Sequence, residues 1–442
     1  MTLFHGKPGL EKVLPVTAEL TPDGHLAVGG CDVVELAREF GTPLYVFDEV
    51  TLRGRARTYR EELGRRYGES LVVYAAKAFI NRPLARLLAD EGLGLDVVSG
   101  GEVAIAHAAG FPMERVYFHG NNKTPDEVEL ALKVGVGRFV IDNLYEVDLL
   151  NRLADGRRQP ALIRLTPGID PHTHQYITTG VIDTKFGLPI STGQAEEAVR
   201  AVLDSRNLEL VGFHVHIGSQ IFDLDAFRRA VDACLDFAGE MVRRYGIELR
   251  EFSPGGGLGI PYLADDPTPE IGDYIETVCG AVKARLAQWA LPRPRLIVEP
   301  GRSIIGPAGV AVYRVGAVKT IPGVRTYVAV DGGMADNIRP ALYGARYEAV
   351  VANRAAEAPT GPVTVAGKYC ESGDILIRDV VLPPVEPGDI LVLPAAGAYC
   401  LAMASNYNAA LKPAVVLVSG GRARLIRRRE TYEDLLALDV VE

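Results

Sequence analysis

The chain has 442 residues, and its 48% hydrophobic and 23% charged residues exclude a largely disordered protein. Its 47 basic and 56 acidic residues give a net charge of −9, which argues against nucleic acid or an anionic membrane as the main partner. We expect a cytoplasmic protein, because no membrane-length apolar run or secretion signal is visible and the five cysteines fit neither a zinc site nor a disulfide framework.

Eight apolar runs follow one another between about residue 70 and residue 300, and helix-like segments lie between them. The runs cover residues 71–77, 92–99, 115–121, 138–143, 161–166, 208–219, 249–257 and 295–300. In one of the helix-like segments, Thr124 stands before Pro125 as an N-cap stands before the first helical residue. Strands that alternate with helices form a parallel sheet, and eight of them predict a closed (β/α)8 barrel. An open doubly wound sheet is the structural alternative.

Beyond residue 308 the strand-like runs come without helices between them, which predicts a second, all-β domain. Residues 21–30 and 42–49 also have β-like sequences and could add strands to that domain. We therefore expect a barrel over residues 43–308 and a discontinuous β domain made of residues 1–42 and 309–442.

Lys77 ends the first strand of the predicted barrel, where an active site of this fold lies. A lysine among apolar neighbours is rarely buried unless it is paired or functional. A partly desolvated amine has a lowered pKa, which suits Schiff-base formation. A lysine whose aliphatic stem packs while its amine reaches solvent is the alternative.

Polar residues and glycines end the other strands as well. They are Asp96, Ser99, His119, Asn121, Asp142, Arg164, His214, His216, Ser219, Gly255, Gly256, Gly257, Glu299, Gly301 and Arg302. The glycine-rich loop at 253–260 would let backbone N–H groups approach an anion, typically a phosphate, although a tight barrel corner would also explain it. We expect only one of His214 and His216 to face the mouth, and we predict no metal site.

The predicted β domain carries Cys370 and Glu371 in a turn between two strand-like runs, and Tyr399 and Cys400 in another. A cysteine beside acidic residues in a loop is less typical of core packing than an isolated buried one. No Ser-His-Asp arrangement and no G-x-S-x-G elbow is present, so acyl transfer by serine is not supported.

A series of motifs resembles the diaminopimelate decarboxylase family. In chain order they are YAAKAF, LDVVSGGE, HGNNKT, YITTGVIDTKFG, GFHVHIGSQI, SPGGGLGI, EPGRSI, DGGMADNIRPALYGARY, CESGDILIRD, GAYC and MASNYN. The first motif and EPGR are shared with ornithine and arginine decarboxylases, whereas HIGSQ, RPALY, CESGD and ASNYN are typical of the diaminopimelate branch. The resemblance implies an alanine-racemase-like barrel that binds pyridoxal 5′-phosphate, and a C-terminal β domain with substrate and dimer contacts.

The resemblance also implies a role for each matching residue. Lys77 would bind the cofactor covalently, His216 would stack on its ring, and Glu299 would bond the ring nitrogen. The residues around the phosphate would be Ser219, Gly256, Gly257, Gly301, Arg302 and Tyr399. The substrate would meet Arg302, Arg339, Tyr343, Glu371 and Tyr399. Cys370 would act as general acid from the neighbouring subunit of a homodimer with shared sites. Cys400 departs from the family pattern, in which a small residue is usual, and would put a second thiol near the mouth.

The implied reaction is decarboxylation of meso-2,6-diaminopimelate to L-lysine and CO2, the last step of lysine biosynthesis. Decarboxylation needs an electron sink, and a carboxylate such as Glu299 keeps the pyridine ring protonated. Arg339 and Glu371 supply the cation and the anion that a distal zwitterion requires. A decarboxylase for another basic amino acid or polyamine precursor is the alternative. A non-catalytic pyridoxal-phosphate protein is disfavoured, because it would need no Cys370 and Glu371.

Overall fold

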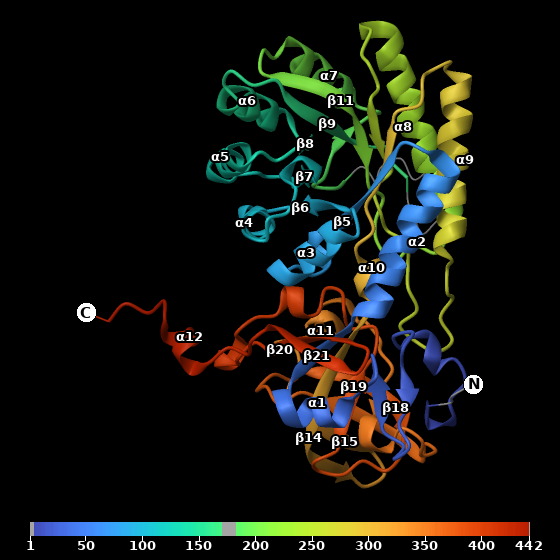
Figure 1. Ribbon diagram of the computed structural model, residues 1–442, viewed down its shortest axis with the longest axis vertical. Coiled ribbons are helices and arrows are strands. Elements are labelled where there is room, and N and C mark those ends of the chain that lie inside the picture. Colours follow the sequence, from blue (N-terminus) through green and yellow to red (C-terminus); the bar gives the residue numbers. More distant parts are fainter. Residues whose placement is uncertain (1–3, 170–182, 442) are drawn as a thin grey trace. The chain divides into compact units, whose positions relative to one another are not determined.

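The computed structural model describes residues 4–169 and 183–441 (Figure 1). Contacts between residues divide the chain into two compact units. The barrel unit consists of residues 56–259 and 269–303, and the β unit consists of residues 1–55, 260–268 and 304–442. In the described residues, no helix is long and apolar enough to cross a membrane.

Eight parallel strands build the barrel unit. They are β5 (Ser70–Ala75), β6 (Gly94–Val97), β7 (Val116–Phe118), β8 (Arg138–Ile141), β9 (Gln159–Thr166), β11 (Leu208–Val215), β12 (Glu251–Ser253) and β13 (Arg295–Val298). Each strand pairs with the next in chain order, and β13 pairs with β5, so the sheet closes. The short strand β10 (Leu188–Pro189) adds to the edge of β9. The predicted (β/α)8 barrel is confirmed, and the open doubly wound alternative is wrong.

Helices follow most barrel strands, as the alternation of the sequence predicts (Figure 1). They are α3 (Arg82–Asp90), α4 (Gly100–Ala108), α5 (Pro125–Val134), α6 (Leu144–Leu153), α7 (Gln194–Asp204), α8 (Leu224–Tyr245), α9 (Ile271–Gln288) and α10 (Arg302–Ile305); α2 (Glu49–Tyr67) precedes the first strand. Thr124 and Glu127 form a reciprocal capping box at the start of α5, with Pro125 at the first helical position. The predicted N-cap is therefore confirmed.

Alternate residues of the barrel strands fill the interior of the barrel with apolar side chains. These buried residues are Leu71, Val73, Tyr117, Val140, Leu162, Val211 and Ile297. Because successive side chains of a strand point to opposite faces, the same strands present their other residues to the surrounding helices. The packed interior leaves the polar strand ends as the place for chemistry.

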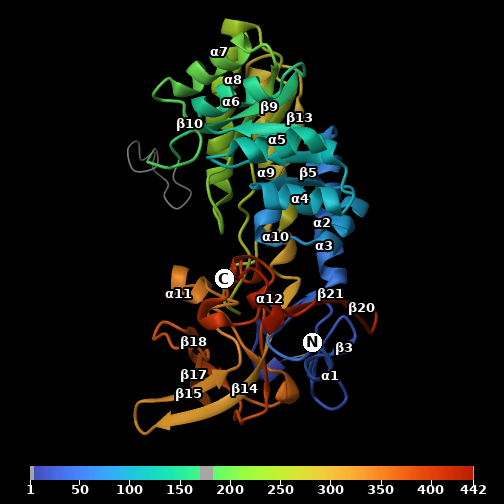
Figure 2. The same cartoon turned by 90° about the vertical axis from the view of Figure 1, so that its left-hand side faces the viewer.

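A mixed sheet forms the centre of the β unit, in the order β18-β17-β15-β14-β4-β20-β21. Its strands are β4 (Leu44–Asp48), β14 (Gly309–Ile321), β15 (Arg325–Val330), β17 (Gly361–Ala366), β18 (Ile375–Leu382), β20 (Ala414–Ser419) and β21 (Arg422–Arg427); β19 (Ile390–Leu393) pairs with β14, and β16 (Val350–Val351) pairs with β19. Figure 2 shows β14 and β15 as a long ribbon of strands. An N-terminal strand therefore completes the sheet, as the β-like sequence at 42–49 suggests.

Two details of the β unit differ from expectation. The range 43–308 assigns residues 44–48 to the barrel, whereas β4 pairs with β14 and β20 of the β sheet. Two five-residue helices, α11 (Arg339–Tyr343) and α12 (Tyr432–Leu436), lie in the region that was predicted to have no helices. Near the N-terminus, α1 (Val33–Phe40) and the small sheet of β1 (Glu19–Leu20), β2 (Leu26–Val28) and β3 (Cys31–Asp32) complete the unit.

Candidate active site

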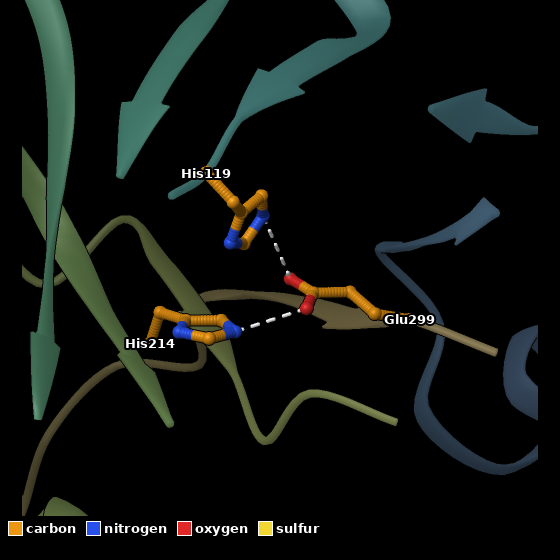
Figure 3. Close-up of side chains that lie close together, drawn as sticks. All are labelled: His119, His214 and Glu299. Atoms are coloured by element: carbon orange, nitrogen blue, oxygen red, sulfur yellow. Dashed lines mark hydrogen bonds and ion pairs between the residues drawn. The ribbon is translucent and has the colours of Figure 1, made fainter. Parts of the chain in front are cut away.

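Glu299 lies at the centre of a buried hydrogen-bonded cluster at the carboxyl ends of the barrel strands (Figure 3). Glu299 directly follows β13 and is 6% exposed. Oε2 lies 2.9 Å from Nε2 of His214, and Oε1 accepts a hydrogen bond of 2.7 Å from Oγ of Ser253. Burial raises the pKa of Glu299, but His214, His119 and Ser253 outweigh burial and hold that pKa below its ordinary value. Glu299 is therefore ionised at neutral pH.

A second carboxyl group, that of Asp96 on β6, shares this cluster. Nε2 of His119 lies 3.6 Å from Oε1 of Glu299 and 3.8 Å from Oδ1 of Asp96. Burial raises the pKa of Asp96, the charge of Lys77 lowers it and that of Glu299 raises it, and the pKa that results is about 8. Burial also lowers the pKa of His119. At neutral pH one carboxyl of the pair thus carries a proton and the other does not.

The donor atoms of His119, His214 and Glu299 lie within 4.8 Å of one another, a separation that a metal ion could also bridge. Each oxygen of Glu299 already has a short hydrogen-bond partner, as described above. We therefore interpret the cluster as hydrogen-bonded support for one carboxylate.

The glycine-rich loop after β12 packs so closely against its neighbours that side chains would not fit. A Cβ atom at Gly256 would overlap the carbonyl oxygen of Glu299, and one at Gly257 would overlap that of Gly218. Gly257 has a φ of 123°, which favours glycine. These contacts fit the tight barrel corner, and glycine-rich turns after a strand also bind phosphates in other proteins.

Arg302 brings a positive charge to the same strand ends. Its Nη2 and Nε donate to Oγ of Ser219 at 3.1 and 3.2 Å. Gly301, just before it, lies so close to Ala75 of β5 that a Cβ atom would come within 2.9 Å of the Ala75 Cβ. A guanidinium group and a hydroxyl beside a glycine loop form the donor set that phosphate binding requires.

His216 follows β11, which neighbours β12, and Lys77 follows β5, which neighbours β13. Lys77 lies in a short turn directly after β5 and is exposed, which differs from the expected partial desolvation of its amine. His216 follows β11, and its Nδ1 lies 2.9 Å from the place of a Cβ atom at Gly255. Burial lowers the pKa of His216, and the charges of Lys77 and Arg164 lower it further. A neutral imidazole therefore stands within electrostatic reach of the lysine.

The expectation that only one of the two histidines faces the mouth is wrong. His214 contacts Glu299, and the charge of Glu299 also acts on His216. The ring of His216 lies beside Gly255 in the loop after β12, so both histidines lie at the carboxyl ends of the strands.

In the β unit, Arg339 is 7% exposed and opens α11. Its guanidinium lies 4.5 Å from the ring centre of Tyr262 and donates a hydrogen bond to the hydroxyl of Tyr347. The same hydroxyl lies 3.3 Å from Sγ of Cys400. Cys400 is fully buried, so its thiol belongs to the packing around Arg339.

The other β-unit residues with expected roles lie at or near the surface. Cys370 and Glu371 form an exposed turn between β17 and β18, in which the amide of Cys370 donates to Oδ1 of Asn408 at 3.1 Å. Tyr343 is 63% exposed, and Tyr399 is partly buried with a φ of 60°. An exposed thiol beside an exposed carboxylate is available to another molecule.

Comparison with known proteins identifies the family. The model for the pyridoxal binding domain of pyridoxal-dependent decarboxylases matches residues 50–306. Diaminopimelate decarboxylase of Bacillus subtilis (strain 168) is 47% identical, over 96% of this chain and 97% of its own length. That of Mycobacterium tuberculosis (strain H37Rv) is 44% identical, over 94% of this chain and 95% of its own. The chain belongs to the diaminopimelate decarboxylase family.

Solved structures of the diaminopimelate decarboxylase family have the same fold. The enzyme from M. jannaschii superimposes with a TM-score of 0.87 at 37% identity, covering 97% of this chain and 98% of that one. Its co-complex with L-lysine gives a TM-score of 0.88 at 37% identity, over 96% and 98%. A lysine/ornithine decarboxylase from Vibrio vulnificus, at 22% identity and a TM-score of 0.73, shares the fold.

Pyridoxal 5′-phosphate is the cofactor of this family, and the barrel mouth fits it. Four neighbouring strands, β11, β12, β13 and β5, each end in one expected element of the site. In that order the elements are His216, the glycine loop, Glu299 with Arg302, and Lys77. A flat neutral ring, a phosphate cradle, a buried carboxylate and an amine match the four parts of the cofactor.

The structure also reveals residues to which the motifs assigned no role. Asp96, His119 and His214 were noted only as strand ends, and Ser253 was not singled out. The rule that residues at the carboxyl ends of barrel strands face the mouth could have found all four. Part of one motif, residues 176–182, lies outside the described residues, while the amide of Gly187 at its end donates to Oδ1 of Asp142 at 2.7 Å.

Proposed function

We propose that this chain decarboxylates meso-2,6-diaminopimelate to L-lysine and CO2 with pyridoxal 5′-phosphate, as the last step of lysine biosynthesis. The observation that carries the proposal is the convergence of Lys77, Glu299, His216 and the glycine loop at four neighbouring strand ends. Full-length relatives at 44–47% identity are named diaminopimelate decarboxylase, and one related structure holds L-lysine, the product of this reaction.

When bound, the cofactor supplies an electron sink for the electron pair that remains when CO2 leaves. Nζ of Lys77 would hold the cofactor covalently, and the ring of His216 would cover one face of the pyridine. The ionised carboxylate of Glu299 would accept a hydrogen bond from the ring nitrogen and stabilise a proton there. Gly256, Gly257, Gly301, Ser219, Arg302 and Tyr399 would surround the phosphate.

We further propose that substrate selection depends on the distal end of diaminopimelate, which carries both an ammonium and a carboxylate. Arg339 would pair with the carboxylate and Glu371 with the ammonium, because each ion needs a partner once water is excluded. Arg302, Tyr343 and Tyr399 would complete the contacts. A decarboxylase of ornithine or arginine has no distal carboxylate to bind and needs no such arginine.

The working unit, in this proposal, is a homodimer with shared sites. Cys370 of one subunit would hold the proton that replaces CO2 on the substrate carbon. That substrate would lie in the site that contains Lys77 of the other subunit. The exposure of Cys370 and Glu371 supports this arrangement, because both groups face outward from their own unit. All five cysteines of the chain are unpaired, which supports a reducing cytoplasm as its location.

A substrate panel tests the proposed function. The purified protein loaded with pyridoxal 5′-phosphate is given meso-diaminopimelate, ornithine, arginine or lysine, and both CO2 and the amine product are measured. We expect CO2 and L-lysine in equal amounts from diaminopimelate and at least a hundredfold lower rates with the other three. Faster release of CO2 from ornithine or arginine would assign the chain to another decarboxylase activity.

A further inference from the structure

The hydrogen bonds that surround Glu299 point to a role for two residues outside the cofactor contacts. We propose that His214 and Ser253 are positioning residues, which keep the Glu299 carboxylate ionised and aimed, and that His214 does so as the tautomer with its proton on Nε2. The inference rests on the proposed place of Glu299 at the ring nitrogen and deepens it.

The geometry fixes which atom of His214 carries the proton. The residue is 1% exposed, and its Nε2 lies 2.9 Å from Oε2 of Glu299. Within the described residues, Nδ1 of His214 has no hydrogen-bond partner. A proton on Nδ1 would be buried without an acceptor, at a cost of about 1–3 kcal/mol. The single proton therefore resides on Nε2, where it is donated to the carboxylate.

Ser253 holds the other oxygen of the same carboxylate. Its Oγ donates to Oε1 of Glu299 at 2.7 Å and accepts a hydrogen bond of 3.1 Å from the amide of Gly255. With one donor on each oxygen, the plane of the carboxylate is fixed at both ends. A lone pair on each oxygen remains for the ring nitrogen of the cofactor.

Several groups on the surrounding strands and on α9 interact electrostatically with Glu299. They are His214, His216, Ser253, His119, Asp96, Arg164 and Tyr274. Burial opposes ionisation, and His214 is the largest of the contributions that favour it. Without the Nε2–H donor, the effect of burial is opposed much less, so the pKa of Glu299 rises and the group keeps a proton to higher pH.

Loss of this donor should change the pH dependence of catalysis, which loss of a purely structural residue would not do. Below its raised pKa, the protonated Glu299 no longer stabilises a proton on the ring nitrogen, so the acidic side of the kcat–pH profile moves to higher pH. Substrate contacts lie elsewhere, so KM should change much less than kcat. Because binding of the cofactor phosphate does not depend on Glu299, the cofactor should remain bound.

Two substitutions at one position separate the hydrogen bond from the shape of the ring. His214→Phe keeps a flat ring and removes the donor, and His214→Gln places an amide N–H near the position of Nε2. We expect His214→Phe to lower kcat at pH 7 by about tenfold or more, with partial recovery as the pH rises, while KM stays within about twofold. His214→Gln should recover most of the lost rate and return the profile toward that of the unsubstituted protein.

Infrared difference spectra provide a readout that needs no substrate. They are recorded on the full-length protein, with cofactor and after its removal, and Glu299→Gln identifies the band. We expect a protonated carboxyl band at pH 7 in His214→Phe that disappears when Glu299→Gln is added, and no such band in His214→Gln. Ser253→Ala, which removes one small group, should change the spectrum and profile in the same direction.

The outcomes separate this inference from the proposed function. If diaminopimelate is not the substrate, the infrared bands still report the charge of Glu299. If His214→Phe does not fold, Ser253→Ala is the test, because it removes the hydrogen bond to Oε1 of Glu299. An ionised Glu299 and an unchanged pH profile in His214→Phe, or in Ser253→Ala if His214→Phe does not fold, would overturn the inference.

Discussion

At the scale of single residues, two buried carboxyl groups in opposite protonation states define the barrel mouth. Burial raises the pKa of Asp96, whereas His214, His119 and the hydrogen bond from Ser253 keep Glu299 ionised in spite of burial. Similar side chains thus acquire different chemistry from their neighbours, as acid–base sites require. One carboxyl can hold a proton near Lys77 while the other stays charged, as its proposed role at the cofactor ring requires.

The raised pKa of Asp96 predicts how stability depends on pH. Between about pH 4 and pH 8 the folded chain keeps a proton on Asp96 that the unfolded chain has lost, so this group stabilises the fold at low pH and progressively less as the pH rises. The free energy of unfolding should therefore fall by up to about 1.4 kcal/mol less per pH unit in Asp96→Asn than in the unsubstituted protein. Urea unfolding of the cofactor-free protein from pH 5 to pH 8 measures the difference. If the free energy of unfolding depends on pH in the same way in both proteins, the pKa of Asp96 is not raised in the folded chain.

Glu299→Gln tests the charge at the ring nitrogen. The substitution keeps the shape and removes the anion, so the cofactor should stay bound while turnover falls by about 10²–10⁴-fold. Cofactor absorbance and single-turnover rates distinguish binding from chemistry. Unchanged turnover would mean that Glu299 does not interact with the ring nitrogen.

At the scale of elements, the loop after β12 depends on the absence of side chains. Gly256→Ala would push a methyl group against the carbonyl of Glu299 and separate the ends of β12 and β13. We expect at least a tenfold loss of affinity for pyridoxal 5′-phosphate, measured by fluorescence titration. Gly280→Ala is the matched control, because Gly280 lies exposed in α9 with open space around it and alanine favours helices. Equal affinity in the two variants would contradict the phosphate cradle.

The barrel strands and most helices could be predicted from the sequence, because each is a local pattern of apolar residues with a cap or turn beside it. The β-like sequence at 42–49 suggests that β4 belongs to the β domain, but its pairing could not be predicted, since its partners β14 and β20 lie more than 250 residues further along the chain. The burial of Arg339 against Tyr262 and Tyr347 also arises only from tertiary packing. Likewise, the cluster around Glu299 is made of residues at the ends of β7, β11, β12 and β13. No local sequence pattern predicts which of these side chains contact one another.

At the scale of the whole molecule, the proposed homodimer assigns Lys77 and Cys370 of one site to different subunits. Lys77→Ala and Cys370→Ala should each be nearly inactive alone. When co-expressed, the mixed dimers have one site with both defects and one with neither, so activity should return to about a quarter of the unsubstituted level under statistical mixing. Tandem affinity purification of mixed dimers is the control. No recovery in proven mixed dimers would mean that each chain completes its own site.

The central claim is that the cofactor is bound at the ends of β11, β12, β13 and β5 through Lys77. The most direct measurement is to reduce the loaded protein with borohydride, digest it, and locate the pyridoxyl mass by peptide sequencing. The account predicts modification of Lys77, the lysine of the YAAKAF segment, and none in Lys77→Ala. A pyridoxyl group on another lysine, or on the Lys77→Ala variant, would contradict it.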